Sequence, residues 1–190
     1  PIKSSAASDV YKRQYYTRHD PCYEYQVNDG CIKLYFPFRN KHTANRFITN
    51  NKCPLENLET LIDTNYKLIV KSQKDKLLML RILKELRIND VGVYVIASET
   101  AKLPDDIVDV LRKTTRIQAY VMLDTDNTGL TSAIEYEKNY GFIALFMTKG
   151  YSAKDPTDLV RITDYNFVKK KFANMYLNEI VNGKKGGVVP

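Results

Sequence analysis

The pattern of apolar and polar positions divides the chain into a strand-rich beginning and a longer part in which strands alternate with helices. In CYEYQVNDGCIKLYFPF, residues 22–38, aromatic or apolar residues alternate with polar ones on both sides of Asn28-Asp29-Gly30. This arrangement predicts a β-hairpin. RFITN, residues 46–50, predicts a third short strand.

Beyond residue 62 the pattern predicts a repeated strand–helix unit. Strands are expected at 66–71, 91–98, 117–123 and 142–147, and helices at 73–88, from Pro104 onward and at 128–139. Gly141 stands where a left-handed helix cap is wanted. After a loop containing Gly150 and Pro156, residues 164–181 predict a terminal helix. The fold class is therefore α/β, a mostly parallel four-stranded sheet flanked by helices and preceded by a small β-rich hairpin lead-in.

Two carboxylates follow the third of these strands. In YVMLDTDNTGL, residues 120–130, an apolar run ends in Asp124 and Asp126. Residues i and i+2 of an extended segment point the same way, so both carboxylates are expected to face one spot. Two negative charges this close repel each other, so we expect a metal ion, a set of hydrogen-bond donors or a helix N-terminus to stabilise the pair. Ligands bind at the carboxyl ends of the strands in parallel sheets, so the pair is a candidate functional site.

Composition limits the class of protein without selecting a function. The chain has 190 residues, 44% hydrophobic and 27% charged, which suits one globular domain. No apolar run approaches the ~20 residues of a membrane span. Cys22, Cys31 and Cys53 form no disulfide framework, so we expect a reducing, cytoplasmic location. His19 and His42 lack spaced cysteine partners and are expected at the surface. The net charge of +7 suits a polyanionic partner, and equally a lysine-rich soluble surface.

Residues 1–14 are expected to be foreign to the fold. SSAASDVYKRQ, residues 4–14, matches letter for letter the in-frame translation of a transposon-type sequencing adapter. It has no apolar core and is not a signal peptide. We therefore expect a metagenomic sequence whose natural start is missing.

Two other known sites share the Asp-x-Asp pattern. An EF-hand loop would use Asp124, Asp126, Gly129 and Glu135, but it requires a preceding helix, and RIQAYVML is β-branched and aromatic. An aspartyl phosphatase also places Asp-x-Asp after a strand, usually the first strand of its domain. Here two strand–helix units come first, so both alternatives are disfavoured.

A larger set of motifs points to one family. LIVKSQKDKLLML, VYVIASET, YVMLDTDNTGL and KDPTDLV resemble, in order and spacing, the Toprim domain of primases and topoisomerases, and most closely that of phage-type DNA primases. The strand-rich lead-in is similar to the segment that precedes Toprim in those proteins. The resemblance covers roughly residues 20–165. It implies a lead-in at 15–62, a Toprim domain at 63–163, and a C-terminal helix and tail at 164–190.

The resemblance also implies site residues. In that family the paired aspartates bind Mg²⁺ or Mn²⁺, which here are Asp124 and Asp126. Asp75 matches the aspartate of the first motif, and the later acid cluster matches Asp155 and, more loosely, Asp158. Gly129 would ease the turn into the helix after the aspartate pair.

The first motif departs from the family pattern. Lys71 occupies the position of the family glutamate, which is often assigned a general-base or metal-binding role. Glu99, after the second strand, is a candidate replacement carboxylate. Lys71, Lys74 and Lys154 are candidates for gripping nucleotide phosphate as point charges.

The implied activity is primer synthesis. Asp124, Asp126, Asp75 and Lys71 would be the catalytic residues of a Mg²⁺-dependent nucleotidyl transfer that makes RNA primers from ribonucleoside triphosphates on single-stranded DNA during replication. A replicative helicase is an expected partner, and an infected bacterial cytoplasm the expected location. The alternative is an inactive Toprim-like module that binds nucleic acid or replication proteins, which the lysine at position 71 favours.

Aromatic and basic residues of the lead-in could grip the template strand. Lys33, Arg39 and Arg46 are candidate nucleic-acid contacts. The stacking candidates are Tyr23, Tyr25, Tyr35, Phe36 and Phe38. The simpler interpretation is that most of these rings face a small core. Lys169, Lys170 and Lys171 are likewise expected on a solvated helix face.

Overall fold

The computed structural model describes residues 20–28, 31–40, 42, 45–49, 55–56, 62–96 and 102–181. The chain forms two compact units, residues 1–59 and 60–190. Residues 1–14, His19 and Glu99, together with the hairpin turn at Asp29-Gly30, lie outside the described residues.

The smaller unit contains the expected hairpin and third strand. Strands β1 (Tyr23–Asn28), β2 (Cys31–Tyr35) and β3 (Phe47–Thr49) form an antiparallel sheet in the order β1-β2-β3. Tyr35 is the register partner of both Tyr23 and Phe47. The three rings stack across the sheet, with centroid distances of 6.4 Å (Tyr23–Tyr35) and 4.7 Å (Tyr35–Phe47).

The larger unit is built on a parallel sheet, as expected. Its strands are β5 (Thr64–Val70), β6 (Val91–Ile96), β7 (Thr115–Met122) and β8 (Ile143–Ala144). β5 pairs in parallel with β6 and with β7, and β7 pairs in parallel with β8. Within the larger unit the strand order is β6-β5-β7-β8. The two-residue strand β4 (Leu55–Glu56), which the sequence pattern did not predict, belongs to the smaller unit.

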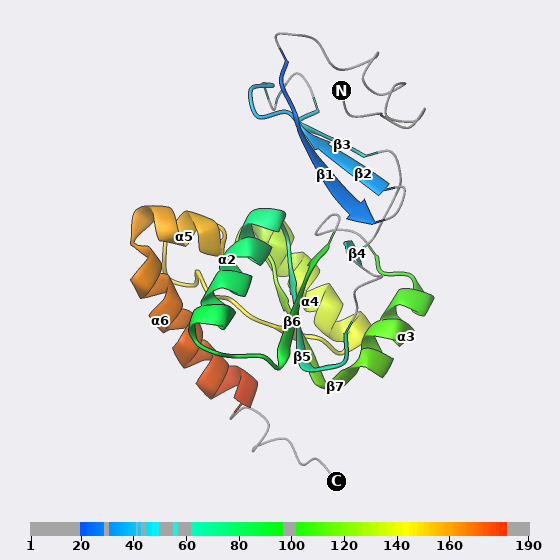
Figure 1. Ribbon diagram of the computed structural model, residues 1–190, viewed down its shortest axis with the longest axis vertical. Helices are drawn as coiled ribbons and strands as arrows, with labels where there is room; N and C mark the ends of the chain where they lie inside the picture. The colour runs from blue at the N-terminus through cyan, green and yellow to red at the C-terminus, as the bar shows by residue number, and fades with distance from the viewer. Residues whose placement is uncertain are drawn as a thin grey trace. The chain divides into compact units, whose positions relative to one another are not determined.

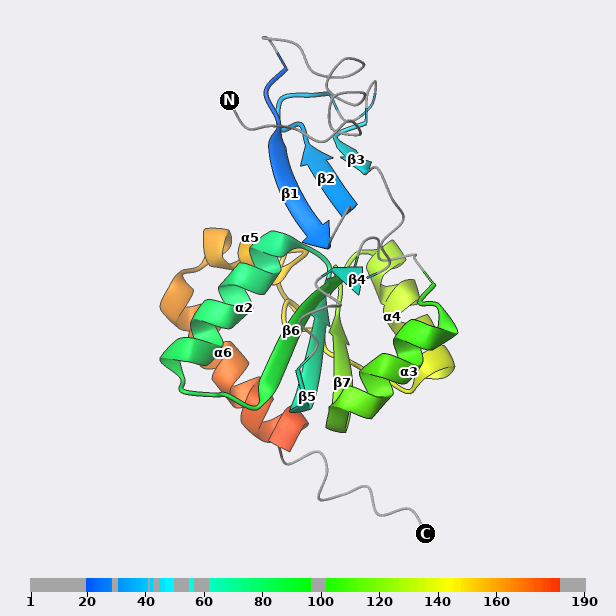
Figure 2. The same ribbon diagram turned by 45° about the vertical axis from the view of Figure 1, so that its right-hand side comes forward.

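The helices cover both faces of this sheet. They are α2 (Gln73–Glu85), α3 (Asp105–Thr114), α4 (Asn127–Tyr140), α5 (Pro156–Ile162) and α6 (Tyr165–Met175). Helices α2, α5 and α6 lie on one face, and α3 and α4 on the other (Figures 1 and 2). Right-handed crossovers place α2 on one face and α3 and α4 on the other, because the chain moves from β5 to β6 in one direction and then back past β5 to β7 and β8.

Three details of the sequence prediction need correction. The fourth strand has two residues rather than six: Leu145 N still donates to Val121 O (2.8 Å), and a turn at 147–150 then leads the chain away. Helix α5 lies in the segment expected to be a loop, and Pro156 at its first turn is a favoured helix start that the pattern analysis overlooked. The terminal helix ends as a π-helix, η2 (Tyr176–Val181).

A buried lysine lies on the α3/α4 side of the central strand. Lys67 is 0% exposed, and its ammonium donates to Ile62 O (2.8 Å), Thr64 Oγ1 (3.3 Å) and Thr114 O (2.9 Å). Burial lowers the pKa of Lys67, and the charge of nearby Asp63 raises it. Because Thr114 ends α3, this lysine ties that helix end to β5.

Candidate metal and nucleotide site

The topology fixes where a ligand is expected. β5 and β7 are neighbours, yet the helices that follow them, α2 and α4, lie on opposite faces of the sheet (Figure 2). The crevice outside the carboxyl ends of two such strands is the usual ligand site of open α/β sheets. Lys71 directly follows β5, and Asp124 comes two residues after β7. The predicted site residues therefore meet at the switch point of the sheet.

Asp124 is buried and paired with the unexpected lysine. Its Oδ2 accepts a very short hydrogen bond from Lys71 Nζ, and the residue is 5% exposed. Its Oδ1 is buried and has no hydrogen-bond partner among the described residues. Burial raises the pKa of Asp124, the hydrogen bond and charge of Lys71 lower it, and the charges of Asp155 and Asp126 raise it again. Lys71 thus places a positive charge directly against the buried Asp124 carboxylate.

Asp126 has a different role from its neighbour. β7 ends at Met122, so strand alternation does not set the direction of either carboxylate, contrary to the expectation from the sequence. Asp126 is the N-cap of α4, and its Oδ1 accepts from Gly129 N (3.1 Å). Lys154 Nζ lies 3.3 Å from its Oδ2. The Gly129 hydrogen bond, followed by the contact with Lys154, lowers the pKa of Asp126 despite partial burial.

Gly129 is required by close backbone approach rather than by a turn. A Cβ at this position would lie 2.1 Å from Asp124 O and 2.8 Å from the Asp124 carbonyl carbon. The first turn of α4 therefore rests directly against the backbone that carries Asp124. Gly141, by contrast, has φ 72° and caps the end of α4 in the left-handed conformation, as predicted.

Asp75 lies in the first turn of α2 and connects it to α5. It is 2% exposed; its Oδ1 accepts from Thr157 Oγ1 (2.7 Å), and its Oδ2 accepts a very short bond from Ser72 Oγ. Burial and the charge of Asp155 raise the pKa of Asp75, while its hydrogen bonds lower it. Ser72 is also the N-cap of α2. The Ser-x-x-Asp spacing of Ser72 and Asp75 is a capping signal that could have revealed Ser72 from the sequence.

Asp155 completes the acidic set from a third segment. It is the N-cap of α5, with Oδ1 accepting from Asp158 N (2.7 Å) and Oδ2 from Lys74 Nζ (2.6 Å). Lys74 Nζ is also 3.9 Å from Asp158 Oδ1. Desolvation lowers the pKa of Lys74, but the hydrogen bond and charge of Asp155 outweigh it and the pKa is raised.

The structure thus forms an acid–lysine cluster, in which each of three lysines contacts an aspartate. Its members are Asp75, Asp124, Asp126, Asp155, Lys71, Lys74 and Lys154. Within the described parts of the chain, no group of three or more His, Cys, Asp or Glu side chains is placed to hold a metal ion. The sequence pattern predicted the residues of the cluster, but not that lysines would pair with its acids.

The basic residues of the lead-in belong to the smaller unit and are partly engaged there. Arg39 donates to Asp20 Oδ2 through both Nε (2.8 Å) and Nη2 (2.6 Å), and its guanidinium lies over the Phe36 ring. Arg46 Nε donates to Arg39 O (2.6 Å). Lys33 lies over the Phe47 ring, 5.4 Å from the centroid. The guanidinium groups thus make internal contacts that the sequence analysis did not anticipate.

The aromatic residues of the lead-in do not all form a core. Phe36 is fully buried, whereas Tyr23 is 61%, Phe47 56% and Phe38 79% exposed. The expectation of a core is therefore correct for Phe36 and wrong for Tyr23, whose ring lies on an exposed face of the sheet, and for Phe38, which lies in a turn after β2. The side chain of Tyr25 lies outside the described residues.

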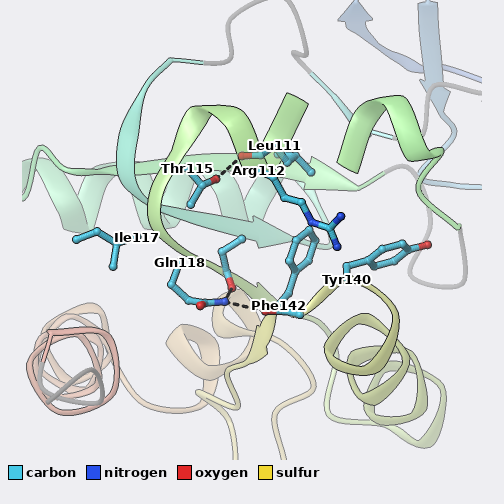
Figure 3. A pocket seen from close by; sticks show the side chains of 9 residues that line it. Leu111, Arg112, Thr115, Ile117, Gln118, Tyr140 and Phe142 are labelled. Atoms are coloured by element: carbon cyan, nitrogen blue, oxygen red, sulfur yellow. Dashed lines mark hydrogen bonds between the residues drawn. The ribbon is translucent and has the colours of Figure 1, made fainter. Parts of the chain in front are cut away.

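Two cavities lie at opposite ends of β7. One, of about 350 Å³, borders Thr125, between the two aspartates. The other, of about 280 Å³, is at the amino end of the strand, where Arg112, Tyr140 and Phe142 come together (Figure 3). Gln118 Nε2 donates to Gly141 O there (2.8 Å). Only the first cavity adjoins the acid–lysine cluster.

Comparisons with known proteins assign no family to this chain. No protein-family model, curated protein or solved structure matches it. Among the described residues, no helix is both long and apolar enough to cross a membrane.

Proposed function

We propose that the larger unit is the catalytic domain of a phage-type DNA primase, a Toprim-like domain that makes RNA primers on single-stranded DNA by Mg²⁺-dependent nucleotidyl transfer. The observation that carries the proposal is Asp124, a buried carboxylate with one unpartnered oxygen at the switch point of the sheet. Ribonucleoside triphosphates, a template strand and a replicative helicase would be its partners in the cytoplasm of an infected bacterium.

The residues present fit a magnesium ion of the kind such enzymes use. Mg²⁺ is commonly held by one or two carboxylates, with waters and substrate phosphate completing the shell. Asp124 offers the unpartnered Oδ1, and Asp126 offers an oxygen whose contact, Lys154, has a side chain that is 62% exposed. When bound, the ion would neutralise phosphate charge and activate the attacking 3′-hydroxyl.

Under this proposal, individual residues of the cluster have different roles. Lys71 favours the ionised form of the buried Asp124, because the hydrogen bond and charge of Lys71 oppose the rise in pKa that burial causes. Lys74 and Lys154 have side chains that are 50% and 62% exposed, so they can turn from their aspartates to an incoming phosphate. Asp75 holds α2 against α5 through Thr157 and thereby positions Lys74.

A second candidate function is a nucleic-acid-binding or replisome-binding module without catalysis. The observation that favours it is the Lys71–Asp124 pair, in which a lysine occupies one oxygen of the central carboxylate. In that case the lysines would bind phosphate groups directly, and no metal ion would be needed.

Titration of the full chain with Mg²⁺ and Mn²⁺, followed by NMR and calorimetry, separates the two functions. We expect binding that is lost in Asp124→Asn/Asp126→Asn, and primer synthesis on single-stranded DNA that Asp124→Ala abolishes with little loss of fold. The matched control is Asp109→Ala, which changes an exposed acid on α3 whose Oδ1 lies 4.0 Å from Arg112 Nη1. Metal-independent nucleic-acid binding without synthesis would support the second candidate, and unchanged synthesis by Asp124→Ala would refute the mechanism.

A further inference from the structure

The cavity beside the paired aspartates has the composition of a binding pocket. It measures about 350 Å³, within the usual range of small-molecule sites. Its walls come from the aspartate loop, the start of α4 and the segment after β8: Thr125, Leu130, Phe146, Thr148, Lys149, Gly150 and Tyr151. We call it the Tyr151 pocket.

Thr125 joins this pocket to the acid–lysine cluster. It is the residue between Asp124 and Asp126, and it also lines the pocket. Thr125 N donates to Lys154 O (2.9 Å), and its hydroxyl is 2.9 Å from the hydroxyl of Thr148. One loop therefore carries two of the aspartates of the cluster and one wall of the pocket.

The walls combine flat apolar surfaces with a cation. Phe146 and Tyr151 provide aromatic rings, and Leu130 adds an aliphatic surface. Lys149 is exposed and has no ion-pair partner among the described residues. Aromatic rings beside a cation are the chemistry by which proteins hold a nucleobase and its attached phosphate.

The pocket is held in place by buried anchors. Thr148 is 2% and Met147 2% exposed, and Tyr151 N donates to Thr148 O (3.0 Å). The ring of Tyr151 meets the ring of Phe167 edge-on at 5.7 Å, and Lys171 Nζ lies 4.7 Å from the Tyr151 ring centroid. The ring is thus oriented by α6, a helix that contributes nothing to the acid–lysine cluster.

We propose that the Tyr151 pocket receives the base of a nucleotide whose phosphates bind at the acid–lysine cluster. The inference rests on the proposed function in that both use the same nucleotide. Tyr151 would be a base-stacking residue, and Phe146 and Leu130 would complete the apolar enclosure. Because rings stack on every base, the pocket would favour nucleotides over inorganic polyphosphate without strong selection among bases.

Calorimetry with ATP and with tripolyphosphate, both in Mg²⁺, tests the pocket on the full chain. Stacking on one ring is worth ~1–3 kcal/mol, so Tyr151→Leu should weaken ATP binding about 5- to 150-fold. Tyr151→Phe keeps the ring and should bind ATP as the unmodified protein does. Tripolyphosphate, which has no base, should bind all three proteins equally.

The outcomes distinguish this inference from the proposed function. Equal weakening of ATP and tripolyphosphate in Tyr151→Leu, or no weakening of either, would overturn the base pocket. A loss confined to ATP would support it, even if the protein made no primer and the primase proposal failed. Circular dichroism of Tyr151→Leu shows whether that variant is folded. Leu130→Ala changes a second apolar residue of the pocket, and the same loss of binding, confined to ATP, is expected for it.

Discussion

The pairing of Lys71 with Asp124 predicts how stability should respond to the loss of the lysine. Lys71→Met keeps most of the side-chain length and removes the charge that faces the carboxylate. Asp124 would then be a buried carboxylate, 5% exposed, that no longer accepts a hydrogen bond from residue 71. The variant therefore isolates the electrostatic contribution of one residue at the switch point.

The expected magnitude follows from the burial of the two side chains. Breaking a fully buried ion pair costs about 3–5 kcal/mol, whereas a surface pair is worth ~0–1 kcal/mol. The side chains of Lys71 and Asp124 are 33% and 8% exposed, which places the pair between these limits. We expect Lys71→Met to lower the free energy of unfolding at pH 7 by about 2 kcal/mol.

The effect should depend on pH in a definite direction. Burial already raises the pKa of Asp124 above 3.8, and removal of Lys71 would raise it further. The folded variant then takes up a proton at higher pH than the unfolded chain does. Its free energy of unfolding therefore rises relative to the unmodified protein as the pH falls toward 3.8. The cost of the substitution should be largest at neutral pH and shrink in acid.

Urea unfolding followed by circular dichroism at several values between pH 4 and 7 measures this effect. Lys138→Met, which removes an exposed lysine of α4, is the matched control and should change stability by less than about 0.5 kcal/mol. The double variant Lys71→Met/Asp124→Asn should lose less free energy of unfolding than the two single variants lose together. A cost that is the same at pH 4 and pH 7, or no cost at pH 7, would refute the assignment of Lys71 as the cation of Asp124.

Two further substitutions test the backbone around the site and the opposite end of the sheet. Gly129→Ala should destabilise the fold by about 2 kcal/mol, because the new Cβ would lie 2.1 Å from Asp124 O. Thr131→Ala, on the exposed face of α4, is the control, and equal melting temperatures of the two variants would contradict the clash. Lys67→Met should lower the free energy of unfolding in urea by about 2 kcal/mol, because the carbonyl oxygens of Ile62 and Thr114 lose their hydrogen-bond donor. Lys102→Met, which changes an exposed lysine, is the control. An unchanged free energy of unfolding in Lys67→Met would mean that burying the charge of Lys67 destabilises the fold as much as its hydrogen bonds stabilise it.

The alternation of strands and helices was predictable because its signals are local. Apolar runs, helical spacing and the cap at Gly141 each depend on a few neighbouring residues, and the structure has those elements within a few residues of the expected bounds. Shorter features were missed where the local signal was weak. β4 has two residues, and α5 has seven, so neither carries enough periodicity to identify it.

The position of the site could also be predicted, but not its electrostatics. Asp124 was placed correctly just after the carboxyl end of a strand, because the apolar run that predicts β7 ends directly before it. The partners of the acids come from far along the chain: 53 residues separate Lys71 from Asp124, and 81 separate Lys74 from Asp155. Sequence spacing carries no information on such pairs until the sheet order is known.

The sequence by itself determined most of the strands and helices, and which polar residues follow them, because backbone propensity and side-chain periodicity act over short distances. The tertiary structure alone decided that β5 and β7 are neighbours, and hence that Lys71 lies against Asp124. It also decided that Asp126 caps a helix while Asp124 is buried, and that a cavity borders Thr125 between them. These features depend on desolvation and on contacts between distant segments, which arise only when the sheet is packed between its helices.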